Sequence, residues 1–211
     1  MAEAIGERLQ AHARLKLVLT ALLMVVFYVP YFLLQRFPLR PPRTLPLGAL
    51  DALVPFQPQW VIVYQSLYLL MPATAWLADS VASLARYARG FLALSAAGFL
   101  VFLLFPVAGP RPPHEAQGLY ALLVRYDTPL NSLPSLHVAL AAYSWLFARR
   151  LAAGGPAAAR ALVALAAVWT LAITYSTLAT KQHYALDLAP GALLALAAHR
   201  WAFGAPKGAF A

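Results

Sequence analysis

Long apolar runs separated by short polar segments dominate the chain. Five runs approach the roughly 20 residues that a helix needs to cross about 30 Å of hydrocarbon. They cover residues 15–35, 60–77, 91–107, 161–178 and 184–203. A sixth run, 135–151, is shorter and carries His137 near its start. This pattern predicts an all-α, polytopic membrane protein with a bundle of six transmembrane helices.

The first apolar run is too long for the apolar region of a secretion signal. The sequence Phe37-Pro38-Leu39-Arg40 follows it instead of a small-residue cleavage site, so we expect a retained helix. The next stretch is apolar but broken by prolines, which is typical of a segment at the membrane interface. The predicted organisation is an N-terminal helix with this interfacial segment over 1–59, a transmembrane core over 60–204 and a cytoplasmic tail over 205–211.

Composition narrows the class of protein. Of the 211 residues, 62% are apolar and 11% are charged, against roughly 45–50% and about 25% in soluble proteins. Such a chain must bury much of its surface in lipid. It contains no cysteine, which excludes disulfides, thiolate metal sites and a cysteine nucleophile. Any chemistry must therefore depend on His, Asp, Glu, Ser, Lys or Arg.

The net charge of +9 comes from 16 basic residues set against 7 acidic ones. The basic residues form short clusters between apolar runs, as orientation signals and phosphate binders do, which argues against a nucleic-acid partner. With the N-terminus in the cytoplasm, ten basic residues fall on the cytoplasmic side and six on the other. We therefore expect both termini to be cytoplasmic, and the loop 108–134 and the loop before Tyr184 to share the opposite face.

Ionisable groups at membrane depth are costly, so each is a functional candidate. Most of them fall in three segments, Gly109-Pro110-Arg111-Pro112-Pro113, Asn131-Ser132-Leu133-Pro134-Ser135-Leu136-His137 and the stretch 176–187. In the third segment, His183 and Asp187 are four residues apart, so a helix would place them on one face. The carboxylate can then orient the imidazole, as a histidine nucleophile or general base requires.

The remaining polar residues fit phosphoryl transfer. His137 could donate a proton to a leaving oxygen. Arg111 and Lys181 supply positive charge for phosphoryl oxygens. Ser135 offers a hydroxyl near the free backbone N–H groups of a helix start.

Each motif also has an ordinary structural interpretation. A His-x-x-x-Asp pair can simply pack a helix, Pro-Ser can be a helix cap, and Arg-Pro-Pro can be solvated or reach the headgroups. His12 and His199 flank apolar runs on the other side, so we expect no catalytic role for them. His114, Glu115, Asp51, Asp127 and Asn131 lie in the relevant loops without a motif that assigns them a role. The functional interpretation depends on three segments converging on one predicted face.

The three segments resemble the signature motifs of the type 2 phosphatidic acid phosphatase superfamily, which read KxxxxxxRP, PSGH and SRxxxxxHxxxD. The matching residues are Arg111-Pro112, Pro134-Ser135-Leu136-His137 and Ser176 to Asp187. The resemblance implies a six-helix core with its site on the outer face. It also implies that His183 is the nucleophile forming a phosphohistidine, Asp187 its orienting partner, His137 the general acid and Arg111 a phosphate ligand.

Two family cations are missing. Leu104 stands where the first motif has Lys, and Thr177 stands where the third has Arg. Lys181, two residues before His183, is the residue expected to compensate. Leu136 in place of Gly, with Lys181-Gln182-His183-Tyr184, is similar to the branch that contains inositol phosphorylceramide synthases and their bacterial relatives. The resemblance covers roughly residues 50–200.

We therefore expect an integral enzyme of a bacterial inner membrane that cleaves a phosphoester or pyrophosphate of a lipid. Lipid enters sideways into a pocket between the third, fourth and sixth spans, and the phosphoryl group passes to water or to an alcohol such as inositol. No metal or other cofactor is expected. The oligomeric state is not predicted.

Two other classes of protein fit some of the same residues. A transporter or scaffold could use the His, Asp and Lys groups as a proton or anion pathway, but polar residues would then follow several spans instead of gathering at one end. A zinc hydrolase could use His137, His183 and Asp187 as ligands.

Overall fold

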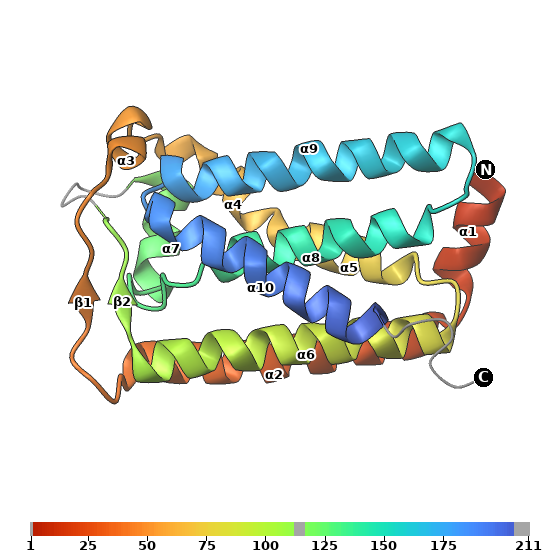
Figure 1. Cartoon of the computed structure of the whole chain (residues 1–211), viewed down its shortest axis with the longest axis horizontal. Helices are drawn as coiled ribbons and strands as arrows, with labels where there is room; N and C mark the ends of the chain where they lie inside the picture. Colours follow the sequence, from red (N-terminus) through yellow and green to blue (C-terminus); the bar gives the residue numbers. More distant parts are fainter. Residues whose placement is uncertain (1, 112–116, 205–211) are drawn as a thin grey trace.

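Helices form nearly all of the computed structural model, which describes residues 2–111 and 117–204. Most of the longer helices run along the long axis of the molecule (Figure 1). In chain order the elements are α1 (Ala2–Gln10), α2 (Ala13–Arg36), β1 (Arg43–Thr44), α3 (Ala49–Leu53), the 3-10 turn η1 (Pro58–Trp60), α4 (Val61–Gln65), α5 (Leu67–Trp76), α6 (Val81–Leu104), β2 (Val107–Ala108), α7 (Gly118–Tyr126), α8 (Leu136–Leu151), α9 (Ala157–Ala179) and α10 (Ala185–Phe203). The expected tail, 205–211, lies outside the described residues.

Three helices are long and apolar enough to cross a membrane by length and composition. They are α2, α6 and α9, with 24, 24 and 23 residues and mean hydropathies of 2.4, 1.7 and 1.8. At 1.5 Å per residue each exceeds about 30 Å of hydrocarbon. Their side chains are largely outward-facing, since 11%, 44% and 28% of the respective 18-residue windows are buried. The chain is therefore an integral membrane protein, while the other three expected spans are not established by this criterion.

The expected span over 60–77 is a broken helix. Helix α4 ends at Gln65 and α5 begins at Leu67, so Ser66 marks the junction. The Ser66 hydroxyl donates to the Val63 carbonyl at 2.6 Å and accepts from the indole of Trp169 at 2.8 Å. The junction is therefore fixed to α9, and α4 and α5 can follow different directions.

Helix α8 is the centre of the bundle and packs against α5, α6, α9 and α10 (Figure 1). Eleven of its 16 residues are buried. Close packing with α6 depends on two glycines, because a Cβ on Gly90 would lie 2.0 Å from the Tyr143 hydroxyl and one on Gly98 would lie 2.6 Å from Leu136 Cδ2. Small residues at helix contacts have this function in membrane bundles. The fourth segment is short because helices, and not lipid, surround it.

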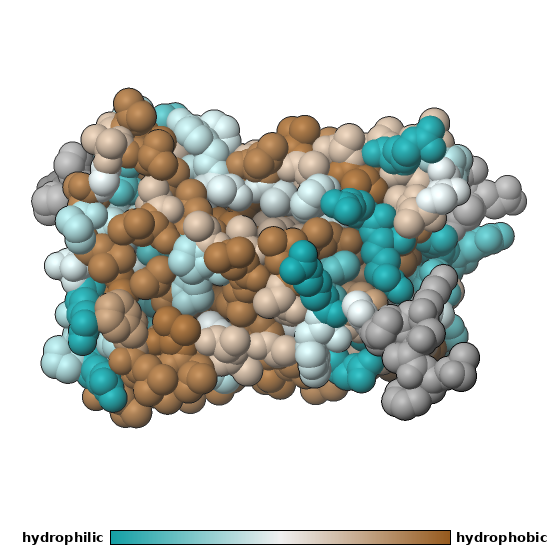
Figure 2. Space-filling view, viewed as in Figure 1, coloured by the Kyte–Doolittle hydropathy of each residue, from teal (hydrophilic) through white to brown (hydrophobic). Residues whose placement is uncertain are grey.

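The two ends of the bundle differ. One end carries α3, α7 and the short parallel pair in which Arg43 is opposite Val107 and Thr44 is opposite Ala108 (Figure 1). The other carries α1 and the start of α2. Hydrophobic residues cover much of the face shown in Figure 2, and hydrophilic ones gather toward the ends, most of all at the end with the chain termini. The strand pair is the one departure from an all-α fold in the described residues.

Candidate active site

His183 lies in the loop between α9 and α10, with its ring held from one side. Its Nδ1 is 2.8 Å from the carbonyl oxygen of Ser132 and 3.3 Å from Asp187 Oδ2. Because a carbonyl oxygen can only accept, Nδ1 must carry the hydrogen in this contact. In the neutral imidazole Nε2 is then the nitrogen without a hydrogen, and it makes no hydrogen bond within the described part of the chain. The ring is 5% exposed and Asp187 is fully buried.

Asp187 is tied to the backbone as well as to the histidine. Its Oδ2 accepts from the Tyr184 N–H at 2.9 Å, and its backbone carbonyl accepts from the Ser135 N–H at 3.1 Å. Its other carboxylate oxygen, Oδ1, is buried without a hydrogen-bond partner among the described residues. Asp187 therefore connects the start of α10 to the start of α8 and places the two motifs side by side.

His137, in the first turn of α8, faces His183 across a small space. The two ring centroids are 6.0 Å apart. The His137 ring stacks on Tyr64 at 3.8 Å, and its buried Nε2 has no hydrogen-bond partner among the described residues. A cavity of about 10 Å³ touches both histidines and Asn131, and it has room for about one water molecule.

That cavity is lined by four parts of the chain. Its walls come from Phe27 and Tyr31 of α2, Leu67 and Tyr68 of α5, the first turns of α8, and the loops before α8 and α10. The fourth span contributes to this cavity through α8, and the expected substrate pocket between the third, fourth and sixth spans stays a prediction. Helices α2 and α5, which were not expected at the site, also line it.

Arg111 is held by two side chains. Its Nε donates to Gln182 Oε1 at 2.9 Å and Nη2 also reaches that oxygen, while Nη1 donates to the Asp127 carbonyl. Nη2 lies 3.3 Å from Asp127 Oδ2, which makes a nearly buried ion pair. Gln182 directly precedes His183 in the chain, so this contact ties Arg111 to the loop that carries the histidine.

Asp127 is a buried carboxylate at the end of α7. It accepts from Gln35 Nε2 and, at 3.3 Å, from the Tyr31 hydroxyl. Burial raises the pKa of Asp127, while Arg111, the two hydrogen bonds and His183 act in the opposite direction. Asp127 therefore links α2 and α7 to the arginine.

Lys181 points toward α3. Its φ of 53° is left-handed, a conformation that commonly ends a helix, and here it follows the last turn of α9. Its ammonium donates to the carbonyls of Asp51, at 2.8 Å, and Val54. Since an ammonium has three donors, one N–H remains for another acceptor. The contact with α3 was not expected from the sequence.

Asp51 connects α3 to the start of α10. Its Oδ1 accepts from the Ala185 N–H at 2.8 Å and its Oδ2 accepts from the Gly48 N–H at 2.8 Å. A carboxylate beside the first N–H groups of a helix is favourable because of the helix dipole. Lys181 and Asp51 together fasten the interfacial segment to the loop that carries His183.

Ser135 is the N-cap of α8. It is completely buried, and its hydroxyl accepts from the Val138 N–H at 3.3 Å. The backbone passes close to α10 here, because a Cβ on Gly191 would lie 2.5 Å from the Ser135 carbonyl. A second close approach brings Gly109 beside the Gln182 carbonyl, 2.4 Å from where a Cβ would stand. These contacts join the three motif segments through their backbones.

Leu104 and Thr177 stand where the family motifs have cations, and neither side chain takes over that function in the site. Leu104 is 49% exposed on the outer surface of α6. Thr177 is buried, and its carbonyl accepts from the N–H groups of Gln182 and His183 at 3.0 and 3.2 Å. Thr177 thereby shapes the loop that presents the histidine.

The structure thus brings His183, Asp187, His137, Ser135 and the Arg111 loop to one end of the bundle, with Lys181 on its margin. Contacts from Ser132, Gln182, Gln35 and Tyr64 were missed, because a backbone carbonyl or a neutral side chain carries no sequence signal. His114 and Glu115 lie outside the described residues. Within the described residues, no group of three or more His, Asp or Glu side chains is placed to hold a metal ion.

Fold and site together define a helical membrane protein with two histidines, a carboxylate and an arginine at one end of the bundle. A model of the PAP2 superfamily matches residues 57–201, more than two-thirds of the chain, and the chain belongs to this superfamily. Comparisons with curated proteins and with solved structures gave no match. Superfamily members are phosphatases, and membership supports a phosphatase-type cleavage of lipid phosphoesters.

Proposed function

We propose that the protein cleaves a phosphoester or pyrophosphate of a membrane lipid through a phosphohistidine on His183. The observation that carries this proposal is the orientation of the imidazole. The Ser132 carbonyl and Asp187 both lie at Nδ1, so in the neutral imidazole Nε2 is the free nitrogen, and His183 and His137 line one cavity. A nucleophilic histidine requires this tautomer.

In the proposed reaction, His183 Nε2 forms a bond to phosphorus while the bond from phosphorus to the leaving oxygen breaks. His137 gives its proton to that oxygen. Water or an alcohol then attacks the phosphohistidine and returns a proton to His137, so atoms and charge balance over the cycle. The ring separation of 6.0 Å supports this pairing of roles.

Arg111 is the proposed phosphate ligand, with Lys181 and Ser135 as further candidates. In the structure its donors are occupied by Asp127 and Gln182. A phosphoryl group would compete with these contacts for the guanidinium, and the planar group can bind phosphate oxygens with two parallel hydrogen bonds. The 10 Å³ cavity is too small for phosphate, so the site must widen when substrate binds.

A neighbouring pocket supports sideways entry of the lipid. It measures about 240 Å³ and lies between α2, α4, α5 and α7. Tyr31 and Tyr68 line both this pocket and the histidine cavity, and Asp127 also contributes to its wall. We propose that the scissile phosphate passes between these two tyrosines.

The proposed membrane arrangement has six crossing segments, formed by α2, α4 with α5, α6, α8, α9 and α10. The basic residues near α1 and the start of α9 support cytoplasmic termini, with the histidines on the opposite side. A bacterial inner membrane and the inositol phosphorylceramide synthase-like branch complete the proposal, and Leu136 and Lys181 support that branch.

The decisive experiment measures phosphate release and lipid products with detergent-purified protein. The substrates are phosphatidic acid, diacylglycerol pyrophosphate and polyprenyl pyrophosphate, each with and without inositol. His183→Ala should abolish turnover, and His199→Ala is the matched control because His199 lies at the opposite end of α10. We also expect phosphorylated protein to be recovered after rapid quenching in alkali and lost after quenching in acid, since phosphohistidine is stable in alkali and hydrolyses in acid.

Each outcome has a clear meaning. Free phosphate that requires His183 supports transfer to water, and a phosphorylated alcohol or exchanged headgroup without free phosphate supports transfer to an alcohol. Equal inactivity of wild type and His183→Ala on every lipid would overturn the proposal. The transport alternative would then need testing, although the clustering of these groups at one end does not favour it.

A further inference from the structure

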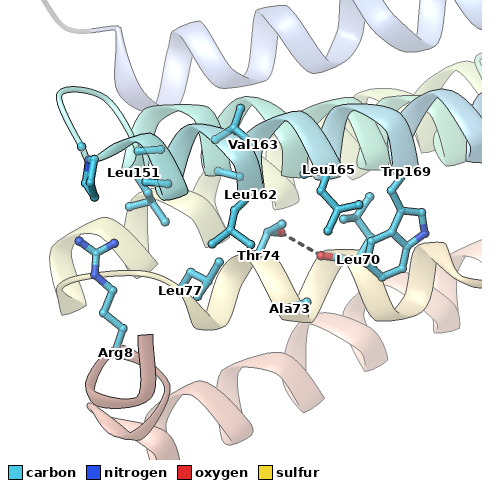
Figure 3. Close-up of a pocket in the computed structure, with 16 residues that line it drawn as sticks. Arg8, Leu70, Ala73, Thr74, Leu77, Leu151, Leu162, Val163, Leu165 and Trp169 are labelled. Carbon is cyan, nitrogen blue, oxygen red and sulfur yellow. Dashed lines mark hydrogen bonds between the residues drawn. The ribbon is translucent and has the colours of Figure 1, made fainter. Parts of the chain in front are cut away.

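A groove lies at the end of the bundle opposite to the histidines. It measures about 350 Å³, and residues of α5, α8 and α9 form its walls. Figure 3 shows Leu162, Leu165 and Trp169 of α9 facing Leu70 of α5 and Leu77, which directly follows α5, across it. Leu162 and Leu165 are 42% and 61% exposed, so the groove is open to the surface that faces lipid.

The groove exists because alanines line much of it. Ala73, Ala148, Ala152, Ala159 and Ala166 contribute side chains of one carbon where larger residues would close the gap between the helices. The polar atoms in its wall are satisfied within the protein, since the Thr74 hydroxyl bonds to carbonyls of α5 and the Trp169 indole bonds to Ser66. The wall is therefore apolar.

One charged side chain stands at the end of the groove. Arg8 of α1 extends toward it, as Figure 3 shows. The guanidinium makes no hydrogen bond or ion pair within the described residues. The groove thus combines an apolar channel with a single available positive charge.

A buried lysine fixes α1 in this place. Lys16 is 2% exposed, and its ammonium donates to the carbonyl of Arg8, to that of Trp76 at 2.7 Å and to that of Ala78 at 3.2 Å. Its three donors are all used. The contact joins α1 to the end of α5, which is the helix that forms one wall. Arg8 is therefore positioned by the fold and not by chance exposure.

We propose that this groove binds an anionic phospholipid, with one acyl chain between α5 and α9 and the phosphate on Arg8. From Ala159 to Trp169 the groove follows ten residues of α9, or about 15 Å, which is half of the roughly 30 Å hydrocarbon thickness and therefore the depth of one leaflet. Arg14, Arg149, Arg150 and Arg160 lie at the same end and add attraction for an anionic leaflet. The site is separate from the candidate active site.

Native mass spectrometry of the detergent-purified protein tests the proposal. The probe is an equimolar mixture of dioleoylphosphatidylglycerol and dioleoylphosphatidylcholine. We expect the wild type to retain one phosphatidylglycerol in preference. Arg8→Gln should lower that retention about fivefold, as expected for one lost charge at a lipid surface, and Arg8→Lys should largely restore it.

Filling the groove provides an independent test. Ala159→Phe should reduce retention of phosphatidylglycerol, whereas Ala164→Phe, an exposed position on α9 outside the groove, should not. Thermal unfolding in detergent verifies that each variant is folded. If Ala159→Phe does not fold, the comparison of Arg8→Gln with Arg8→Lys decides the question. Arg111→Gln separates this site from the active site, because binding here should not depend on Arg111.

Three results would overturn the proposal. These are equal retention of the two lipids, a preference that survives Arg8→Gln, and a preference that disappears in Arg111→Gln. A dimer that Ala159→Phe dissociates, without a change in bound lipid, would show that a second copy occupies the groove instead.

Discussion

His183 makes a shorter contact with the Ser132 carbonyl, at 2.8 Å, than with the Asp187 carboxylate, at 3.3 Å. Two acceptors therefore share one imidazole N–H, and one of them belongs to the backbone. The orientation of the ring does not depend on the carboxylate alone. This distinguishes the site from a triad in which a single carboxylate sets the tautomer.

Asp187→Asn should consequently be milder than the corresponding change in such a triad. We expect kcat to fall about 10²-fold, against roughly 10⁴-fold where the carboxylate alone fixes the tautomer. Steady-state phosphate release from the best lipid substrate measures this. Since the asparagine oxygen can still accept from the Tyr184 N–H, the thermal unfolding midpoint should stay close to wild type. A loss as complete as that of His183→Ala would contradict the prediction.

Lys181→Gln tests whether the ammonium has both a binding and a structural function. Removing it breaks two hydrogen bonds to α3, so the unfolding midpoint should fall, by an amount that reflects about 1–3 kcal/mol. If the third N–H also binds phosphate, KM should rise about tenfold while kcat changes less. An unchanged KM beside a lowered midpoint would assign Lys181 to structure alone.

Gly109→Ala should damage the site through the backbone. Its Cβ would stand 2.4 Å from the Gln182 carbonyl, so the Arg111 loop and the His183 loop must separate. We expect a cost of about 1–3 kcal/mol in unfolding free energy and a fall in kcat/KM. Gly6→Ala is the control, because a Cβ there meets nothing within 4 Å. Equal behaviour of the two variants would show that the loops tolerate separation.

Asp127 should make stability depend on pH. Burial raises its pKa above the ordinary 3.8, so the folded protein binds more protons than the unfolded chain between these two values. Stability from this group is thus present at low pH and decreases as pH rises from 3.8 through the raised pKa. The difference in unfolding midpoint between wild type and Asp127→Asn should decrease over the same range. A difference that grows with pH would contradict this.

Chelation tests the absence of a metal requirement. All of the proposed cations are side chains, so activity should survive prolonged treatment with EDTA. Phosphate release before and after treatment, with metal analysis of the same sample, measures the effect. Loss of activity that zinc or magnesium restores would contradict the proposed mechanism.

The sequence predicted the apolar helices well where lipid surrounds them. Helices α2 and α9 bury only 11% and 28% of their apolar windows within the protein, and their bounds lie within four residues of the predicted runs. Helix α6, with 44% buried, begins at Val81, ten residues before its predicted run. Helix α8 is surrounded by other helices and can be short, and α4 with α5 is broken at Ser66. Hydropathy alone does not record which neighbours a helix has.

The candidate site was predictable where ionisable residues form motifs at fixed spacing. His183 and Asp187 are four residues apart, and the first turn of α10 with the turn before it places both side chains on the same side, where they meet. The destination of Lys181 was not predictable, because it depends on where α3 packs. The second hydrogen-bond acceptor of the His183 ring was also not predictable, since Ser132 contributes its backbone carbonyl and any residue type could do so.

The interfacial segment between α2 and α4 places its apolar side chains outward. Phe37, Leu39, Leu47, Leu50 and Leu53 are all at least 63% exposed, while Asp51 fastens the same segment to the start of α10. In the proposed membrane arrangement, this segment holds the histidines at a set depth beside the plane of the headgroups. The enzyme would accordingly sense its substrate in two dimensions, so that its rate follows the mole fraction of lipid phosphate in the bilayer or micelle and falls on surface dilution at constant bulk concentration.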